Sequence, residues 1–192
     1  MKKNALLHAI TIIGCLCCSV LLCAAQTSFF PHYLNDAILV PDLLLCLTVG
    51  MGILARQSHS THGVTYDSAY GALFGIFAGV LADATGGCGI FLLPLLYMLC
   101  GYGAHVCADL LPNKKFYVYL AVGVVSAALR AVIAIIYVFL SVGSVQLFDV
   151  ARYVCLPLFL GTCMSLLPIY LVSLVLTLPI RKIKHQTIDK II

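Results

Sequence analysis

Long apolar stretches separated by short polar breaks are the dominant pattern along this chain. A helix that spans a lipid bilayer needs about 20 consecutive apolar residues, and six stretches come close to or exceed that length. They predict spanning helices at residues 5–25, 37–55, 68–84, 89–111, 116–142 and 154–180. The third span is short and meets the fourth in a Gly-rich turn at residues 84–89, whereas the last two are long enough to tilt.

The composition agrees with a membrane protein. Hydrophobic residues make up 62% of the 192 residues and charged residues only 9%, against about 25% charged residues in a soluble domain. Such a chain cannot cover a water-facing surface. We therefore expect an all-α membrane protein, a bundle of six transmembrane helices that forms one integral membrane domain over residues 1–192. The segment Arg56–Asp67 is expected to be a polar loop.

The positions of the positive charges predict the orientation. If the N-terminus lies in the cytoplasm, nine of the eleven Lys and Arg residues fall on the cytoplasmic side of the six spans. The opposite loops hold only Arg152 as a positive charge, beside Asp36 and Asp149. Cytoplasmic loops carry the excess of Lys and Arg, so both termini are expected in the cytoplasm. The net charge of +4 is too small to imply binding to nucleic acid.

The N-terminus permits a second interpretation. Basic residues, an apolar stretch and small residues near Ala25 are also found in a cleaved signal peptide. The apolar stretch here is about 20 residues long, whereas the hydrophobic region of a signal peptide has 7–15. The length favours a retained first span, and cleavage would leave five.

The ten cysteines fall almost entirely within apolar runs. Buried free cysteines usually act as small packing residues, and we expect that role here. The spacing of Cys15 and Cys18 matches C-x-x-C, but no basic neighbour is present to generate a thiolate. A redox role is not predicted.

A ridge of glycines marks the third span. Gly71, Gly75 and Gly79 recur every fourth position, and Asp83 continues the series. Residues four apart lie on one helix face, and small residues let two backbones approach closely in lipid. The ridge therefore predicts a seat for a neighbouring helix, either within the bundle or from a partner. Asp83 either belongs to that seat or is hydrated at the outer interface.

Three charged residues lie within the predicted spans, at Asp42, Asp83 and Arg130. Counting 1.5 Å per residue places all three at roughly 21–22 Å from the cytoplasmic face. Intramembrane charges usually have a partner, and the arginine fork can bind two carboxylates. We hypothesise an Asp42/Asp83–Arg130 cluster. The alternative is that each side chain reaches the outer interface separately.

Catalytic patterns are sparse. His59 and His62 have a metal-ligand spacing but no nearby carboxylate or thiol, and His105, Cys107 and Asp109 do not share one helix face. The pattern Gly79–Asp83 is similar to that of lipid-head-group phosphotransferases, whose next aspartate is replaced by Gly87. No enzyme, catalytic residue, metal site or cofactor is predicted.

The order of motifs resembles the rod shape-determining MreD family of bacteria. The carrying segments are VPDLLLCLTVGMGILAR (Val40–Arg56), the Gly71–Val106 segment with its G-x-x-x-G-x-x-x-D pattern, and LTLPIRKI (Leu176–Ile183). The resemblance covers most of the chain from Val40 onward. Arg130 departs from the family pattern, which has an acidic or neutral residue there.

The resemblance implies a non-enzymatic scaffold in the bacterial inner membrane. This scaffold belongs to the rod complex, or elongasome, which maintains rod shape and lateral peptidoglycan synthesis. Its expected partner is MreC, a single-span membrane protein, with indirect links to MreB, RodA and a transpeptidase, and contact with membrane lipids. Partner binding or helix packing is assigned to Pro41, Asp42, Gly71, Gly75, Gly79, Asp83, Gly101 and Tyr102, with Pro41 in a first helical turn.

The six-span fold is also similar to substrate-binding subunits of energy-coupling-factor vitamin transporters, and this similarity supplies the main alternative function. Ala5 and Ala9 would form the weak docking motif of such a subunit. Short, apolar outer loops argue against closure over a polar vitamin. A third class, an intramembrane lipid enzyme, would need turnover by the purified protein.

Overall fold

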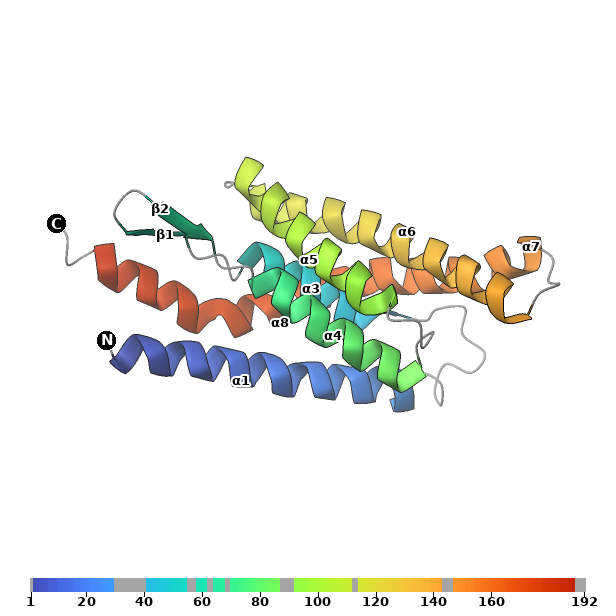
Figure 1. Ribbon diagram of the computed structural model, residues 1–192, viewed down its shortest axis with the longest axis horizontal. Coiled ribbons are helices and arrows are strands. Elements are labelled where there is room, and N and C mark those ends of the chain that lie inside the picture. The colour runs from blue at the N-terminus through green and yellow to red at the C-terminus, as the bar shows by residue number, and fades with distance from the viewer. Residues whose placement is uncertain are drawn as a thin grey trace.

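The protein is a bundle of helices that run mostly along its long dimension (Figure 1). The computed structural model describes residues 2–29, 41–54, 58–61, 64–67, 70–86, 92–111, 114–142 and 147–188. The long helices are α1 (Lys2–Ala24), α3 (Leu43–Leu54), α4 (Tyr70–Gly86), α5 (Leu92–Leu110), α6 (Lys115–Val142) and α8 (Leu156–Ile188). Short elements are the π-helical turns η1 (Ala25–Phe29) and η3 (Ala151–Cys155), and α7 (Leu147–Val150).

Each predicted span overlaps one of these long helices, so the helical prediction is confirmed for the described part of the chain. The ends differ by a few residues in most cases. The predicted second span begins at residue 37, whereas α3 begins at Leu43, and residues 37–40 lie outside the described residues. The last helix continues eight residues beyond the predicted end at residue 180.

The segment predicted as a polar loop contains a β-hairpin, which corrects that expectation. Strands β1 (Ser58–Thr61) and β2 (Val64–Asp67) pair antiparallel, with Ser58 opposite Asp67 and Thr61 opposite Val64. Threonine, valine and tyrosine favour strands. That preference was hidden in the sequence because the segment is short and has no apolar face.

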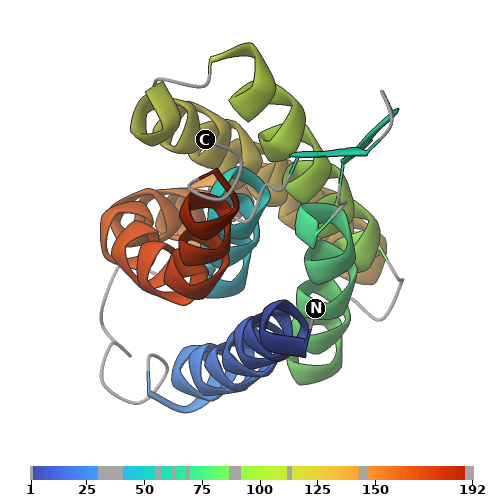
Figure 2. The same cartoon turned by 90° about the vertical axis from the view of Figure 1, so that its left-hand side faces the viewer.

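Helix α3 lies at the centre of the bundle. All twelve of its residues are buried, and it packs against α1, α4, α5, α6 and α8 (Figure 2). Twelve residues extend about 18 Å, less than the roughly 30 Å hydrocarbon core of a bilayer. In a bilayer, a helix of this length could end within the hydrocarbon core only where protein covers its terminal polar groups. The neighbouring helices bury every residue of α3 from Leu43 to Leu54.

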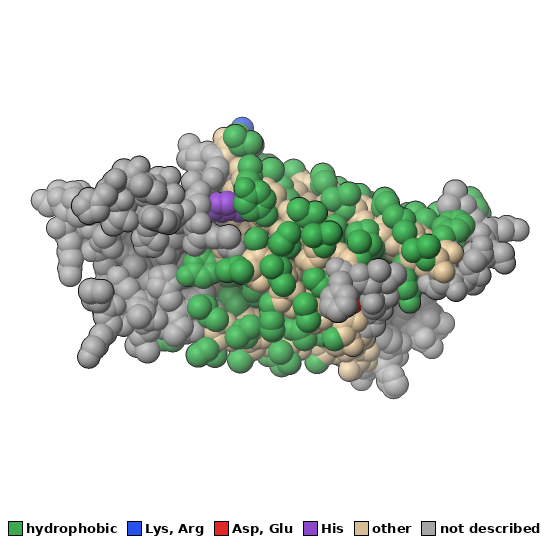
Figure 3. Space-filling view, in the orientation of Figure 1, with side chains coloured by type: hydrophobic (Ala, Val, Ile, Leu, Met, Phe, Trp, Pro, Cys, Tyr) green, Lys and Arg blue, Asp and Glu red, His purple; other side chains and the backbone are tan. Residues whose placement is uncertain are grey.

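Two helical stretches are long and apolar enough to cross a membrane, Lys115–Leu140 and Phe148–Leu178. The remaining apolar helices in the described residues are shorter. Large hydrophobic side chains are exposed along the outside of the bundle, among them Leu21, Leu73, Leu140 and Met164. Figure 3 shows hydrophobic side chains over the middle of the visible face. A soluble monomer rarely exposes so continuous an apolar surface.

The two ends of the bundle differ in what they carry. The start of α1, the β-hairpin and the end of α8 lie at one end, and α7 lies at the other (Figure 1). Aromatic side chains are exposed near both ends, with Tyr117 at the start of α6, and Phe148 and Tyr153 around η3. Arg152 lies over the Tyr153 ring, 5.5 Å from its centroid.

Candidate functional site: a buried charged centre

The site begins with the residue that starts the central helix. Asp42 is the N-cap of α3. Its Oδ1 accepts a hydrogen bond from the backbone N–H of Leu45 at 3.2 Å, and its carbonyl accepts one from the N–H of Cys46 at 3.3 Å. Aspartate favours this position because its side chain satisfies an N–H that has no partner within the helix. Pro41 therefore precedes the cap, and its predicted place in the first turn is wrong.

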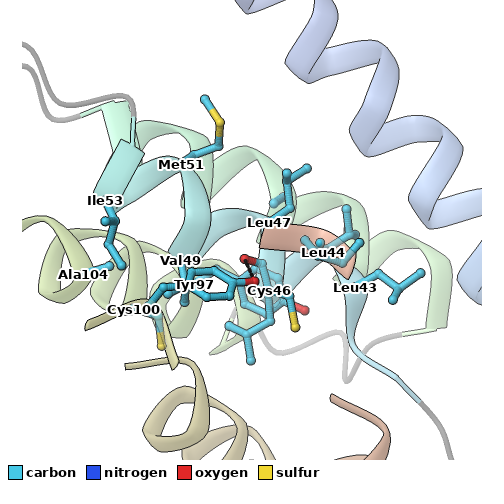
Figure 4. Close-up of a cluster of buried hydrophobic side chains, with 14 of the residues drawn as sticks. Leu43, Leu44, Cys46, Leu47, Val49, Met51, Ile53, Tyr97, Cys100 and Ala104 are labelled. Carbon is cyan, nitrogen blue, oxygen red and sulfur yellow. Dashed lines mark hydrogen bonds between the residues drawn. The ribbon is translucent and has the colours of Figure 1, made fainter. Parts of the chain in front are cut away.

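The Asp42 carboxylate also receives side chains from two other helices. Tyr97 of α5 lies beside Cys46 and Val49 of α3 in the buried cluster of Figure 4. Its hydroxyl lies 2.5 Å from Asp42 Oδ1 and 2.6 Å from Asp42 Oδ2. Arg130 Nε of α6 lies 3.1 Å from Oδ2. The side chain of Asp42 is 1% exposed and that of Arg130 is 15% exposed. A charge is stable at such burial only when it is paired and hydrogen-bonded, and Asp42 is both.

Hydroxyl and thiol groups extend this centre to α8. The backbone N–H of Asp42 donates to Thr162 Oγ1 at 3.1 Å, and Thr162 Oγ1 donates to the Leu158 carbonyl at 2.6 Å. Cys46 Sγ lies 3.3 Å from Ser165 Oγ. The centre therefore joins α3, α5, α6 and α8 through polar contacts within an otherwise apolar core.

The structure brings together two of the three charges that the sequence grouped. Asp42 and Arg130 pair, whereas Asp83 on α4 is not among the described groups that bond the Asp42 carboxylate. The reason lies in the helix register. The backbone of Tyr97 is level with Gly75, and Asp83 lies eight residues further along α4, about 12 Å by helical rise. Equal predicted depth was not enough to bring Asp83 to the pair.

The glycine ridge of α4 packs inside the bundle, against the backbone of α5. A Cβ placed on Gly75 would collide with the Tyr97 carbonyl, and one on Gly79 with Pro94 Cα. A Cβ on Gly71 would lie 2.5 Å from Gly52 Cα. These glycines are buried and cannot form a docking surface. The packing alternative of the prediction therefore holds, and the partner-binding alternative does not.

The burial of Pro41 and Asp42 excludes them in the same way from an exposed partner surface. Gly101 sets the packing of α5, because a Cβ there would collide with the Gly71 carbonyl. Tyr102 is 55% exposed on the outside of α5, so it does not pack within the bundle, and of its two predicted roles only partner binding stays a prediction. Neighbouring positions on a helix point in different directions, and only one of the two faces α4.

Sequence reasoning missed three important members of the core: Tyr97, Thr162 and Gly52. Tyr97 carried a usable signal, since a buried tyrosine hydroxyl needs a hydrogen-bond partner. Gly52 carried a weaker sequence signal, as a second small residue in an apolar span. In the structure it faces the Gly101 carbonyl, and a Cβ added to Gly52 would lie 2.5 Å from that oxygen. Thr162 gave no signal, since threonine is common in apolar helices.

The described residues contain no group of three or more His, Cys, Asp or Glu side chains placed to hold a metal ion. His105 is buried on α5 and Cys107 is half-buried on it, while the side chain of Asp109 lies outside the described residues. His59 lies on β1, and His62 is outside the described residues.

Comparisons with protein-family models, with curated proteins and with solved structures found no match for this chain.

Proposed function

We propose that this chain is a non-enzymatic scaffold that crosses a membrane six times. The observation that carries this proposal is that the Asp42–Arg130 ion pair is enclosed within the bundle. Asp42 is inaccessible, both its oxygens accept hydrogen bonds, and Tyr97, which supplies two of these contacts, is itself buried. A catalytic carboxylate must meet its substrate, whereas this one holds helices together. Its role is to fix the bundle.

The apolar belt and the charge distribution support the membrane part of the proposal. Large hydrophobic side chains cover the outside, and exposed aromatic residues lie near both ends, as in the interfacial belts of membrane proteins. Lys114, beside α6, and the basic residues at both termini would face the cytoplasm. Arg152 would lie at the opposite interface.

At the level of a particular system, we propose that the chain acts as an MreD-like subunit of the rod complex in a bacterial inner membrane. It would bind MreC and, through it, influence MreB, RodA and a transpeptidase. The resemblance in motif order supports this assignment. Two of the motifs that carry the resemblance have structural roles in this chain. Asp42 of P-D-L-L caps the central helix α3, and the glycine ridge lets α4 pack closely on α5. The partner would then meet the outer faces of the bundle.

Purification from native membranes in mild detergent tests the proposal. A single-span companion with an extracytoplasmic domain supports it, and depletion in a rod-shaped host should make the cells round. A bound vitamin would support the transporter subunit instead. Turnover of a lipid-linked precursor by the purified protein would show that the chain is an enzyme.

A further inference from the structure

The last helix of the bundle projects beyond the end of the central helix. Gly50 of α3 packs against Ser173 of α8, and the two helices run in the same direction. Leu54, the last residue of α3, is therefore about level with Thr177. From there α8 continues to Ile188, about 16 Å further by helical rise. This projection lies at the end of the bundle where α1 begins (Figure 1).

The outer face of α8 carries an apolar stripe that ends in a lysine. Its exposed members recur every third or fourth position, at Leu167, Leu171, Val175 and Leu178. Lys182 is the next position of the series, and residues four apart share a helix face. The stripe from Leu167 to Leu178 extends about 16 Å, close to half of the roughly 30 Å hydrocarbon core. It therefore matches the length of the acyl chains in one leaflet.

The first basic residues of the projection lie at the depth of lipid head groups. The long apolar stretch of α8 ends at Leu178, and each head-group layer is about 5–8 Å thick. Arg181 and Lys182 lie about 5 and 6 Å beyond Leu178 by helical rise. Lys184 lies about 9 Å beyond it and, seven residues after the buried Thr177, continues the inner face of α8. Residues 179–188 contain no Asp or Glu.

We propose that this end of α8 binds an anionic phospholipid of the phosphatidylglycerol class. Its acyl chains lie along the stripe from Leu167 to Leu178, and its phosphate lies at the level of Arg181 and Lys182. Arginine and lysine both bind phosphate, and basic clusters directly beyond a membrane span attract anionic lipids. An acidic protein segment would need the charges but not the apolar stripe beside them. The inference rests on the proposed membrane crossing, with the end of α8 in the cytoplasm.

The test uses the purified full-length protein in a neutral detergent. Native mass spectrometry measures binding of the first molecule of phosphatidylglycerol or of phosphatidylcholine with the same acyl chains. We expect phosphatidylglycerol to bind at least about fivefold more tightly, and Lys182→Gln or Arg181→Gln to lower this preference about fivefold. Lys184→Gln is the matched control, because it removes the same charge from the same helix at a position farther out on another face. It should lower the preference less than about twofold.

Melting curves without added lipid show which variants fold, and Arg181→Gln decides the question should Lys182→Gln fail to fold. Equal binding of the two lipids would overturn the inference. Equal losses in Lys182→Gln and Lys184→Gln would also overturn it, because they would indicate only a general attraction of anions to this end of the bundle. Inorganic phosphate should displace no more lipid than chloride at the same ionic strength, since phosphate has no chains for the stripe. Greater displacement by phosphate would indicate a site for a free anion instead.

The inference and the proposed function can fail separately. A single-span companion without a lipid preference would support the scaffold and overturn only the lipid site. A lipid preference lost in Lys182→Gln, without any such companion, would support the lipid site and count against the scaffold.

Discussion

Arg130 and Asp42, 88 residues apart in the chain, form a buried ion pair with Nε 3.1 Å from Oδ2. The carboxylate is also the N-cap of α3, so one side chain both starts the central helix and binds α6. Removing either function affects the other. The pair is therefore a sensitive point at which to test the architecture.

Arg130→Gln should destabilise the protein strongly, because it leaves the Asp42 charge buried without its cation. Loss of one partner of a buried pair typically costs about 3–5 kcal/mol. Thermal unfolding in detergent measures the effect. Arg152→Gln serves as the control, since Arg152 is exposed and loses only its contact with the Tyr153 ring, worth about 0.5–1 kcal/mol.

Charge reversal tests which carboxylate is the partner. Arg130→Asp should abolish assembly, and adding Asp42→Arg should restore part of it. Adding Asp83→Arg in place of Asp42→Arg should restore nothing, since Asp83 is not among the groups around Asp42. Rescue through Asp83 alone would contradict the observed pairing.

Tyr97→Phe should destabilise the bundle by about 1.5–3 kcal/mol, the usual contribution of a hydrogen bond to a charged group. The substitution preserves the ring and removes only the hydroxyl that contacts both Asp42 oxygens. Tyr102→Phe on the same helix is the control, because Tyr102 is exposed. Equal melting temperatures for the two variants would argue against the bonded network.

Gly75→Ala should separate α4 from α5. Its new methyl group would collide with the Tyr97 carbonyl, which belongs to the backbone and cannot rotate away. Overpacking typically costs about 1–3 kcal/mol, and we expect the upper part of that range. Gly103→Ala is the matched control, because nothing lies within 4 Å of its added Cβ. There, helix propensity predicts a gain of up to about 1 kcal/mol.

The membrane topology is testable through α6. A reporter fused after Lys114 should lie in the cytoplasm, and one inserted in the 143–146 segment should lie on the opposite side. The expected difference follows from a single crossing by the Lys115–Leu140 stretch. Reporters with equal accessibility at both positions would show that α6 does not cross.

The helices were predictable because their signal is local. Long apolar runs between polar breaks gave α1, α4, α5 and α6 to within three residues at each end. The glycine ridge also predicted that α4 would pack closely on another helix. The direction of the ridge was not predictable, since the same stripe could have served a partner chain or α5.

The charged centre was predictable only in part. The depths calculated from helical rise are equal for Asp42 and Arg130, which agrees with their pairing. Asp83 has the same calculated depth, although it does not bond the Asp42 carboxylate. Rotation about the helix axes and the register between α4 and α5 excluded Asp83 and introduced Tyr97. Both quantities depend on how side chains from different helices pack, and one sequence contains no direct record of them.

The sequence by itself determined where the apolar helices lie, because helix formation and hydrophobic length are properties of consecutive residues. It also determined that small residues would let α4 approach another backbone. Only the tertiary structure decided that α3 is the buried central helix and that Asp42 is its cap and the partner of Arg130. Those facts arise from contacts between residues as far as 120 positions apart, such as Asp42 with Thr162, and only the packed bundle brings them together.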